Sequence, residues 1–266
     1  MKRLALLTLA IALTASAAFA GDNDWRLRIK KEADGWTASF NGPMDYGSGG
    51  KNRLRGSGVK VEKVRALGAF TKLRIDGPFD VTLTQAAADQ ATVIADDNIE
   101  PLVETVVEGD VLVIRMKRDA GFTTRRAPTV RLDARALQAI YVSGSGDLGS
   151  ERFKADSLKL DVSGSGDVQF GLVEVKDLSV SISGSGDVRM AGRADQQSWS
   201  INGSGDVDAR SLGGRTAKVN INGSGDVALG VTEQLDAQLS GSGDLSYGGR
   251  PQLRQSVSGS GEIHRR

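Results

Sequence analysis

The sequence predicts an all-β fold, namely a parallel β-helix (solenoid) with coils of about 20 residues. A five-residue phrase, Ser/Asn-Gly-Ser-Gly-Asp/Glu, recurs seven times in the second half of the chain. Its acidic residues stand 18 to 20 residues apart and are Asp147, Asp167, Asp187, Asp206, Asp226, Asp244 and Glu262. A near-constant spacing in this range indicates stacked structural units.

Apolar residues flank each phrase at fixed positions. Five residues before the acid stand Val142, Val162, Ile182, Ile201, Ile221, Leu239 and Val257. One residue after it stand Leu148, Val168, Val188, Val207, Val227, Leu245 and Ile263, and seven before it stand Ile140, Leu160, Val180, Trp199, Val219, Ala237 and Gln255. This period of two is typical of half-buried strands. A helix is disfavoured because each glycine in its interior costs about 1 kcal/mol relative to alanine.

The length of the repeat selects among the repeat architectures. A unit of about 20 residues is too short for a propeller blade of about 40, and the asparagine signature of leucine-rich repeats is missing. In a parallel β-helix, successive coils lie about 4.8 Å apart, so that equivalent side chains stack into ladders along the solenoid.

The sequence leaves two interpretations of the glycines open. If the strand runs unbroken through the phrase, both glycines face inward and Ser and Asp face outward, because side chains alternate. The inward column, which suggests a corner or a pinched cross-section, would then contain Gly144, Gly164, Gly184, Gly203, Gly223, Gly241 and Gly259. In the second interpretation the glycines are turn residues with positive φ, which breaks the alternation.

Residues 1–20 have the pattern of a secretory signal peptide. Lys2 and Arg3 precede an apolar run from Leu4 to Leu13, and Ala18-Phe19-Ala20 provides a cleavage site of small residues. We therefore expect an exported protein that begins near Gly21 and is periplasmic, on the cell surface or extracellular. No later segment approaches the roughly 20 apolar residues of a transmembrane span, and the chain has no cysteine for disulfides or lipid attachment.

Three further segments follow the signal. Residues 21–58 read as a flexible, Gly-rich lead-in with one short strand near Trp25–Ile29. Residues 59–128 form a first β-rich part, with a turn at Glu108-Gly109-Asp110, a short helical turn within 97–102 and a charged loop from Lys117 to Pro128. Residues 129–266 contain the seven coils of the repeat β-helix, and we expect both parts to form one continuous body.

Composition narrows the classes of partner. The formal net charge is +1, with 34 Lys and Arg against 33 Asp and Glu interspersed along the chain. A nucleic-acid surface is not expected, because it usually needs a strongly basic patch. Aromatic residues make up 5% of the chain, so there is little material for stacking on bases or sugars.

An ordered series of stretches carries a family resemblance. The stretches are Phe70-Thr71-Lys72-Leu73-Arg74-Ile75-Asp76-Gly77, Phe79-Asp80-Val81-Thr82-Leu83-Thr84-Gln85, Asp97-Asn98-Ile99, Gly109-Asp110-Val111-Leu112-Val113-Ile114 and Leu137-Gln138-Ala139-Ile140-Tyr141-Val142-Ser143-Gly144-Ser145-Gly146-Asp147. Over roughly residues 59–263 the chain resembles the bacterial putative auto-transporter adhesins with a head GIN domain. The resemblance implies a pectin-lyase-like β-helix in an exported protein that acts in cell adhesion, and it brings no catalytic residues.

The repeated outward side chains are the candidate interaction ladder. They are Asp147, Asp167, Asp187, Asp206, Asp226, Asp244, Ser145, Ser165, Ser185, Ser204, Ser224 and Ser242. Many weak, equivalent contacts can add up to strong attachment to a repeating partner. We expect a non-enzymatic protein that binds a cell-envelope or extracellular polysaccharide or protein, without a cofactor, and homo-oligomers are compatible with the pattern.

Three other functions stay open. The polar ladders could simply solvate a structural scaffold. Stacked aspartates about 5 Å apart repel one another, which Ca²⁺ or backbone N–H donors would relieve, although one carboxylate per coil is few for an ion that takes about 6 to 8 oxygens. A polysaccharide lyase or hydrolase is the least supported, because any acidic ladder yields carboxylate pairs and the single histidine, His264, stands near the disordered-looking end.

Overall fold

The computed structural model describes residues 26–32, 35–41, 44–46, 54–118 and 120–266, with side chains from residue 54 onward. The predicted signal peptide, residues 1–20, lies outside the described residues. The chain divides into two compact units, residues 1–43 and 44–266. In the first unit, β1 (Arg26–Glu32) pairs antiparallel with β2 (Gly35–Asn41), where the sequence predicts one short strand.

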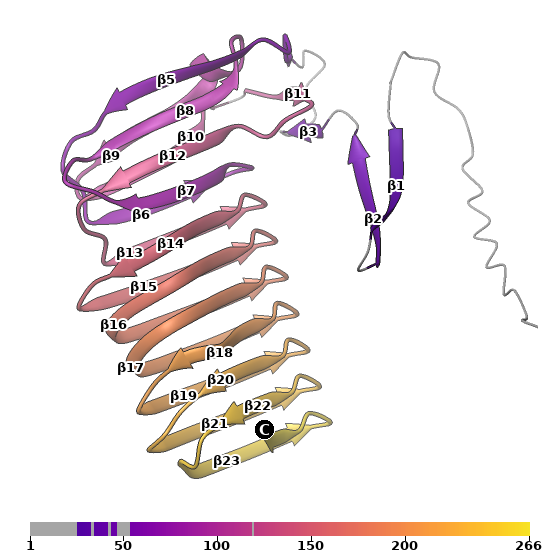
Figure 1. The fold of residues 1–266 in the computed structure, drawn as a ribbon, viewed down its shortest axis with the longest axis vertical. Helices are drawn as coiled ribbons and strands as arrows, with labels where there is room; N and C mark the ends of the chain where they lie inside the picture. The colour runs from indigo at the N-terminus through magenta and orange to yellow at the C-terminus, as the bar shows by residue number, and fades with distance from the viewer. Residues whose placement is uncertain (1–25, 33–34, 42–43, 47–53, 119) are drawn as a thin grey trace, which may run out of the picture. The chain divides into compact units, whose positions relative to one another are not determined.

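The second unit is a stack of coils built from two rows of strands (Figure 1). Neighbouring strands of the first row are parallel. In stacking order the row contains β10 (Val111–Met116), β6 (Lys72–Asp76), β13 (Ala139–Gly144), β15 (Ser157–Gly164), the second halves of β16 (Val168–Gly184) and β17 (Val188–Gly203), β19 (Thr216–Gly223), β21 (Gln234–Gly241) and β23 (Gln252–Gly259).

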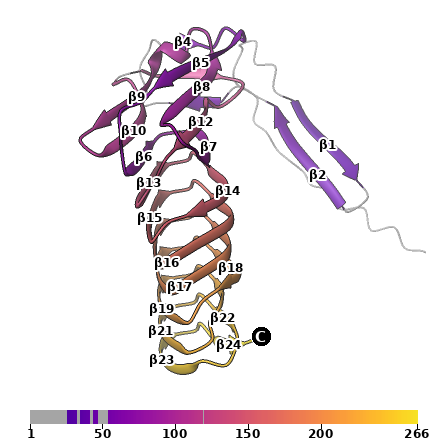
Figure 2. The ribbon, with the colours of Figure 1, turned by 60° about the vertical axis from the view of Figure 1, so that its left-hand side comes forward.

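The second row runs beside the first, as the turned view shows (Figure 2). Its strands are also parallel to their neighbours. In stacking order it contains β12 (Thr129–Ala134), β7 (Asp80–Gln85), β14 (Leu148–Lys154), the first halves of β16 and β17, β18 (Val207–Gly213), β20 (Val227–Gly230), β22 (Leu245–Gly248) and β24 (Ile263–Arg265). This arrangement confirms the predicted parallel β-solenoid, while the pectin-lyase likeness stays a prediction.

Antiparallel strands cover the end of the stack that lies nearest the N-terminus of this unit. β9 (Val103–Glu108) pairs with β10, β8 (Gln90–Asp96) pairs with β12, and β5 (Lys60–Ala66) pairs with β8. The predicted helical turn is the 3-10 helix η1 (Glu100–Leu102), and the predicted turn at Gly109 connects β9 to β10. The predicted charged loop contains β11 (Phe122–Thr124), which pairs with β3 (Met44–Tyr46) and β4 (Leu54–Arg55).

The core lies between the two rows and consists almost entirely of aliphatic side chains. The three predicted inward positions are buried in the first six repeats, which confirms the alternation. In the last repeat the same positions are partly or fully exposed, and Val257 is 43% exposed. All eight residues of β23 are exposed, because among the described residues no further coil follows it.

Candidate functional site

The seven repeated phrases stack into one continuous border of the solenoid, which we term the turn edge (residues 143–147, 163–167, 183–187, 202–206, 222–226, 240–244 and 258–262). In each of the seven repeats, the first-row strand ends at the first glycine of the phrase, and the second-row strand that follows begins one residue after the acid. The interpretation in which the strand runs unbroken through the phrase is therefore wrong. The chain turns here because the backbone adopts a conformation that side chains rarely allow.

The first glycine of every phrase has positive φ, between 110° in Gly144 and 148° in Gly203, which confirms the turn interpretation. The turn is tied to its neighbour by the backbone. The N–H of the following serine donates to the carbonyl of the first glycine one coil earlier, as in Ser185 to Gly164 at 2.8 Å and Ser224 to Gly203 at 2.9 Å. Only glycine combines this φ with such a close approach.

The second glycine of each phrase is buried, and from Gly166 onward it faces the equivalent glycine of the preceding coil. A Cβ atom placed on Gly166, Gly186 or Gly205 would lie 2.1 to 2.2 Å from the carbonyl oxygen one coil earlier. This is the pinched cross-section that the sequence suggested. It involves both glycine columns, since a Cβ on Gly164 would lie 2.3 Å from the carbonyl oxygen of Gly144, but only the second glycine is buried in every repeat. Two successive backbones are in direct contact at this point, so the coils cannot accept a side chain.

The aspartates connect successive coils through a hydrogen bond that the sequence alone does not reveal. Each carboxylate accepts, through Oδ1, the backbone N–H of the acidic residue one coil later. The six bonds are 2.8 to 3.0 Å long and run from Asp167 to Asp147, Asp187 to Asp167, Asp206 to Asp187, Asp226 to Asp206, Asp244 to Asp226 and Glu262 to Asp244. These backbone N–H donors also offset the repulsion between the carboxylates of successive coils, which is one of the two possibilities that the sequence left open.

The serines of the candidate ladder are exposed in all six positions and, like the aspartates, lie at equivalent positions of successive coils. Among the described residues, their hydroxyls make no hydrogen bond, and Oδ2 of the aspartates accepts none. Asp187 has an ionic contact through Oδ2 with Arg189, at 3.5 Å. The turn edge therefore presents one free hydroxyl and one carboxylate oxygen per coil.

Beside the turn edge, the outer side of the second row carries a shallow groove of about 400 Å³. Its charged and polar lining contains five aspartates and two arginines and consists of Asp187, Arg189, Asp206, Asp208, Arg210, Asp226, Asp244, Ser246 and His264. Arg210 donates two hydrogen bonds to Asp208, which lower the pKa of that carboxyl from 3.8 to about 2. His264 lies in β24, where the sequence analysis expected a disordered end. The groove is thus a mixed-charge surface.

The structure reveals one further turn that stacks on the turn edge, at residues 76–80. The sequence analysis did not predict it. Gly77 lies against Gly144, and Phe79 occupies the position of the second glycine, next to Gly146. Asp80 takes the place of the acid, and Val81 donates its N–H to the carbonyl of Asp147 at 2.7 Å. Burial raises the pKa of Asp80, and the neighbouring charge of Asp147 raises it further. The available signal was the phrase Asp76-Gly77-Pro78-Phe79-Asp80, in which only the first glycine and the acid are kept.

The turn edge that the structure describes offers no set of ligands for the calcium ion that the sequence left possible. Among the residues that the structure describes, no three His, Cys, Asp or Glu side chains are close enough together to hold a metal ion. One oxygen of each ladder aspartate already accepts a backbone N–H. A hard cation that takes about 6 to 8 oxygens would have to compete with that bond in every coil.

Fold and site together define a parallel β-solenoid with a repeated polar border. The sequence profile of the family described as "Putative auto-transporter adhesin, head GIN domain" matches residues 69–251, and the chain belongs to this family. No curated protein matches the chain. Among the described residues, no helical segment has the length and hydrophobicity of a membrane span.

Solved structures share the fold. A putative adhesin from Bacteroides fragilis is 23% identical with a TM-score of 0.75, over 80% of this chain and 99% of that chain. A putative lipid binding protein from Parabacteroides distasonis is 26% identical with a TM-score of 0.65, over 80% and 99%. A putative adhesin from Parabacteroides merdae is 22% identical with a TM-score of 0.66, over 80% and 98%. These proteins are similar to this chain over nearly their whole length.

Proposed function

We propose that this protein is an exported, non-enzymatic binding protein that attaches to a cell-envelope or extracellular partner through the turn edge. The observation that carries the proposal is the regular array of outward Ser and Asp side chains, one pair per coil. Membership in a family described as adhesins supports the same role and a location outside the cytoplasm. The pattern at residues 1–20 is the sequence support for export.

The two carboxylate oxygens have separate roles in this proposal. Oδ1 holds the next coil through its backbone N–H, so it is a structural acceptor. Oδ2 and the serine hydroxyl are available to a partner at intervals of about 4.8 Å, the spacing of neighbouring strands. A partner with a repeating structure can engage several rungs at once, and the combined attachment then exceeds that of any single contact.

The test uses a variant in which Asp167, Asp187, Asp206 and Asp226 are all changed to Asn. Asn keeps the Oδ1 acceptor and removes the charge, so we expect an unchanged circular dichroism spectrum and weaker binding. Binding is measured on isolated envelope fractions and a panel of polysaccharides. Lipid vesicles are included because one similar structure is described as a lipid binding protein.

Two further variants control this test. The first control changes Glu151, Glu174 and Glu233 to Gln and Asp156 to Asn. These four residues are exposed and lie outside the turn edge. The net charge therefore changes by the same amount as in the four-Asn variant, and binding should stay intact. Changing the four ladder aspartates to Ala removes the acceptor as well, and each lost hydrogen bond should cost about 1 kcal/mol of stability. Unchanged binding by the Asn variant would contradict the role of the turn edge.

A structural scaffold is the alternative, and the same experiment separates it. If no fraction, polysaccharide or vesicle binds the unmodified protein, the proposal fails, and light scattering would then show whether the solenoid assembles into oligomers. Release of reducing ends from the panel would overturn the non-enzymatic part of the proposal.

A further inference from the structure

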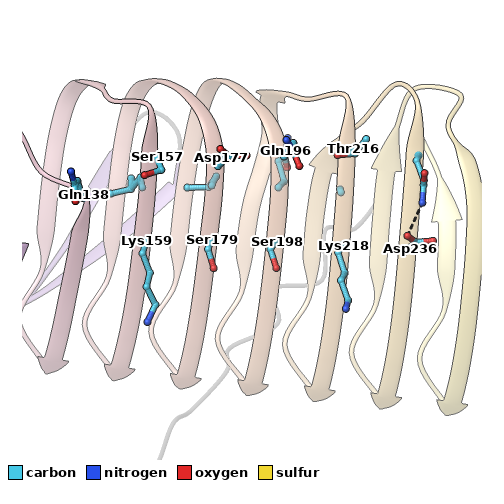
Figure 3. Close-up of a pocket in the computed structure, with 15 residues that line it drawn as sticks. Gln138, Ser157, Lys159, Asp177, Ser179, Gln196, Ser198, Thr216, Lys218 and Asp236 are labelled. Carbon is cyan, nitrogen blue, oxygen red and sulfur yellow. Dashed lines mark hydrogen bonds between the residues drawn. The ribbon is translucent and has the colours of Figure 1, made fainter.

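A second groove lies on the outer face of the first strand row, away from the turn edge. It follows the beginnings of the strands and has a volume of about 540 Å³ (Figure 3). In five coils its outward residues stand eight and ten positions before the acid, and Gln138 stands nine before Asp147. Its polar lining consists of Gln138, Ser157, Lys159, Asp177, Ser179, Gln196, Ser198, Thr216, Lys218, Gln234 and Asp236. Along each strand these positions lie four to six residues before the first residue of the turn edge, which is roughly 13 to 20 Å.

The floor of the groove is rigid. Leu158 and Leu178 belong to the buried core beneath it. In the next coil Gln197 occupies the position of these two leucines, and it is 3% exposed. Its amide donates to the carbonyls of Ala194 and Gly230, both at 3.4 Å, and its Oε1 accepts the indole N–H of Trp199 at 3.0 Å. The side chains above this floor are therefore held on a fixed surface.

The walls carry hydrogen-bonding groups without partners in the protein. Within the part of the chain that the structure describes, the side chains of Ser179, Ser198, Gln196 and Thr216 make no hydrogen bond. Gln234 donates to Oδ2 of Asp236 at 2.8 Å, while Oδ1 of Asp236 is buried and has no partner. A buried polar atom without a partner is rare in folded proteins.

The charges of the groove indicate an uncharged ligand. Two lysines and two aspartates line it, so their formal charges cancel. Lys159 already contacts Asp161 at 3.0 Å and lies 5.6 Å from the centre of the Tyr141 ring. The groups in the middle of the groove are hydroxyls and amides, which both donate and accept hydrogen bonds.

We propose that this groove binds an extended segment of a neutral, hydroxyl-rich polysaccharide that lies along the axis of the solenoid. Each coil contributes polar side chains to the groove, and successive coils lie about 4.8 Å apart, which is close to the length of one sugar in an extended chain. The sugar hydroxyls would pair with the free hydroxyls and amides, without the aromatic stacking that the composition disfavours. This inference goes beyond the turn edge, because it assigns a separate surface and the chemical class of its ligand.

The test measures binding of neutral cello-oligosaccharides and chito-oligosaccharides, from the disaccharide to the octasaccharide, by titration calorimetry. The groove spans six coils, so affinity should rise with chain length and level off at about six sugars, with one sugar per coil. Oligogalacturonates of the same lengths provide the charged comparison. Binding of the oligogalacturonates alone, or of neither neutral series, would overturn the proposal.

A triple variant locates the site. Changing Gln196, Ser198 and Thr216 to Ala should weaken binding by at least about tenfold, since three hydrogen-bonding groups are lost. The matched control changes Gln169, Ser211 and Thr82 to Ala; these residues are exposed on second-row strands, outside both the groove and the turn edge, and should leave affinity unchanged. Equal melting temperatures verify that both variants fold.

The Asp-to-Asn variant of the turn edge distinguishes failure of this inference from failure of the proposed function. It should bind the neutral oligosaccharides normally. If it loses them while the groove triple variant binds normally, the turn edge is the glycan site and the groove proposal is wrong. If envelope binding depends on the turn edge and no oligosaccharide binds, only the groove proposal is overturned.

Discussion

At the turn edge, both glycines of each phrase need room for the carbonyl of the preceding coil. The first glycine also needs a positive φ, which is 136° at Gly184. The neighbouring aspartate has a role that goes beyond solvation, because it accepts an N–H of the next coil. These contacts explain why the phrase recurs without a catalytic role for its acid.

We predict that Gly184→Ala lowers the free energy of unfolding by about 2 to 4 kcal/mol, because it combines backbone strain with overpacking. The new Cβ would lie 2.2 Å from the carbonyl oxygen of Gly164. Gly149→Ala is the matched control, since no atom lies within 4 Å of its Cβ position and its φ is not positive. Chemical denaturation of both variants measures the difference, and equal stability would show that the turn relaxes without cost.

At the scale of the elements, the antiparallel strand β5 is attached to the body by a buried carboxylate. Glu100 in η1 is 2% exposed and contacts Lys63 at 2.7 Å and Arg65 at 2.5 Å. Burial alone would raise the pKa of Glu100, but hydrogen bonds and charge from Lys63 and Arg65 outweigh it and lower the pKa from 4.5. Arg65 also donates to the carbonyl of Val103 at 2.7 Å, so the contact joins β5 to the start of β9.

Glu100→Gln should therefore reduce stability at neutral pH by about 1 to 3 kcal/mol, less than for a fully buried pair because both cations are partly exposed. A lowered pKa means that the charged form stabilises the fold above about pH 4.5 and that this contribution is lost as pH falls through the folded-state pKa. The stability difference between the two proteins should thus shrink in acid. Melting temperatures between neutral and acidic pH measure it.

Glu62→Gln is the control on the same strand. Glu62 contacts Lys60 and Arg131, but its side chain is 45% exposed, so we expect little change in melting temperature. A stability difference for Glu100→Gln that does not vary with pH would show that shape, rather than charge, holds β5 in place.

At the scale of the whole solenoid, the strands and their inward residues followed from the sequence because burial imposes a period of two. The additional turn at Asp76–Asp80 could not be predicted from the sequence, since Pro78 and Phe79 replace the serine and the second glycine. Phe79 is fully buried. The stacking order also differs from the chain order, because β6 lies between β10 and β13.

The candidate sites were only partly predictable for a similar reason. The turn edge is repeated in sequence and was found, although the hydrogen bond between Asp187 and Asp167 depends on coil geometry. The groove was missed because its residues change from coil to coil, for example from Ser179 to Ser198 to Lys218. Exposed positions on a sheet carry no packing constraint that would make them periodic.

The two ends of the described stack differ, and this difference predicts how the molecule unfolds. Antiparallel β9 and β8 cover the first coils, whereas β23 is exposed along its whole length and Leu253 is 36% exposed. In a solenoid each coil is stabilised mainly by its neighbours, so a coil with one neighbour opens more easily. We expect backbone amides of β21 and β23 to exchange with solvent on the order of tenfold or more faster than those of β13 and β15. Hydrogen exchange followed by mass spectrometry measures this gradient. Equal protection along the stack would mean that the coils open only together, as one cooperative unit.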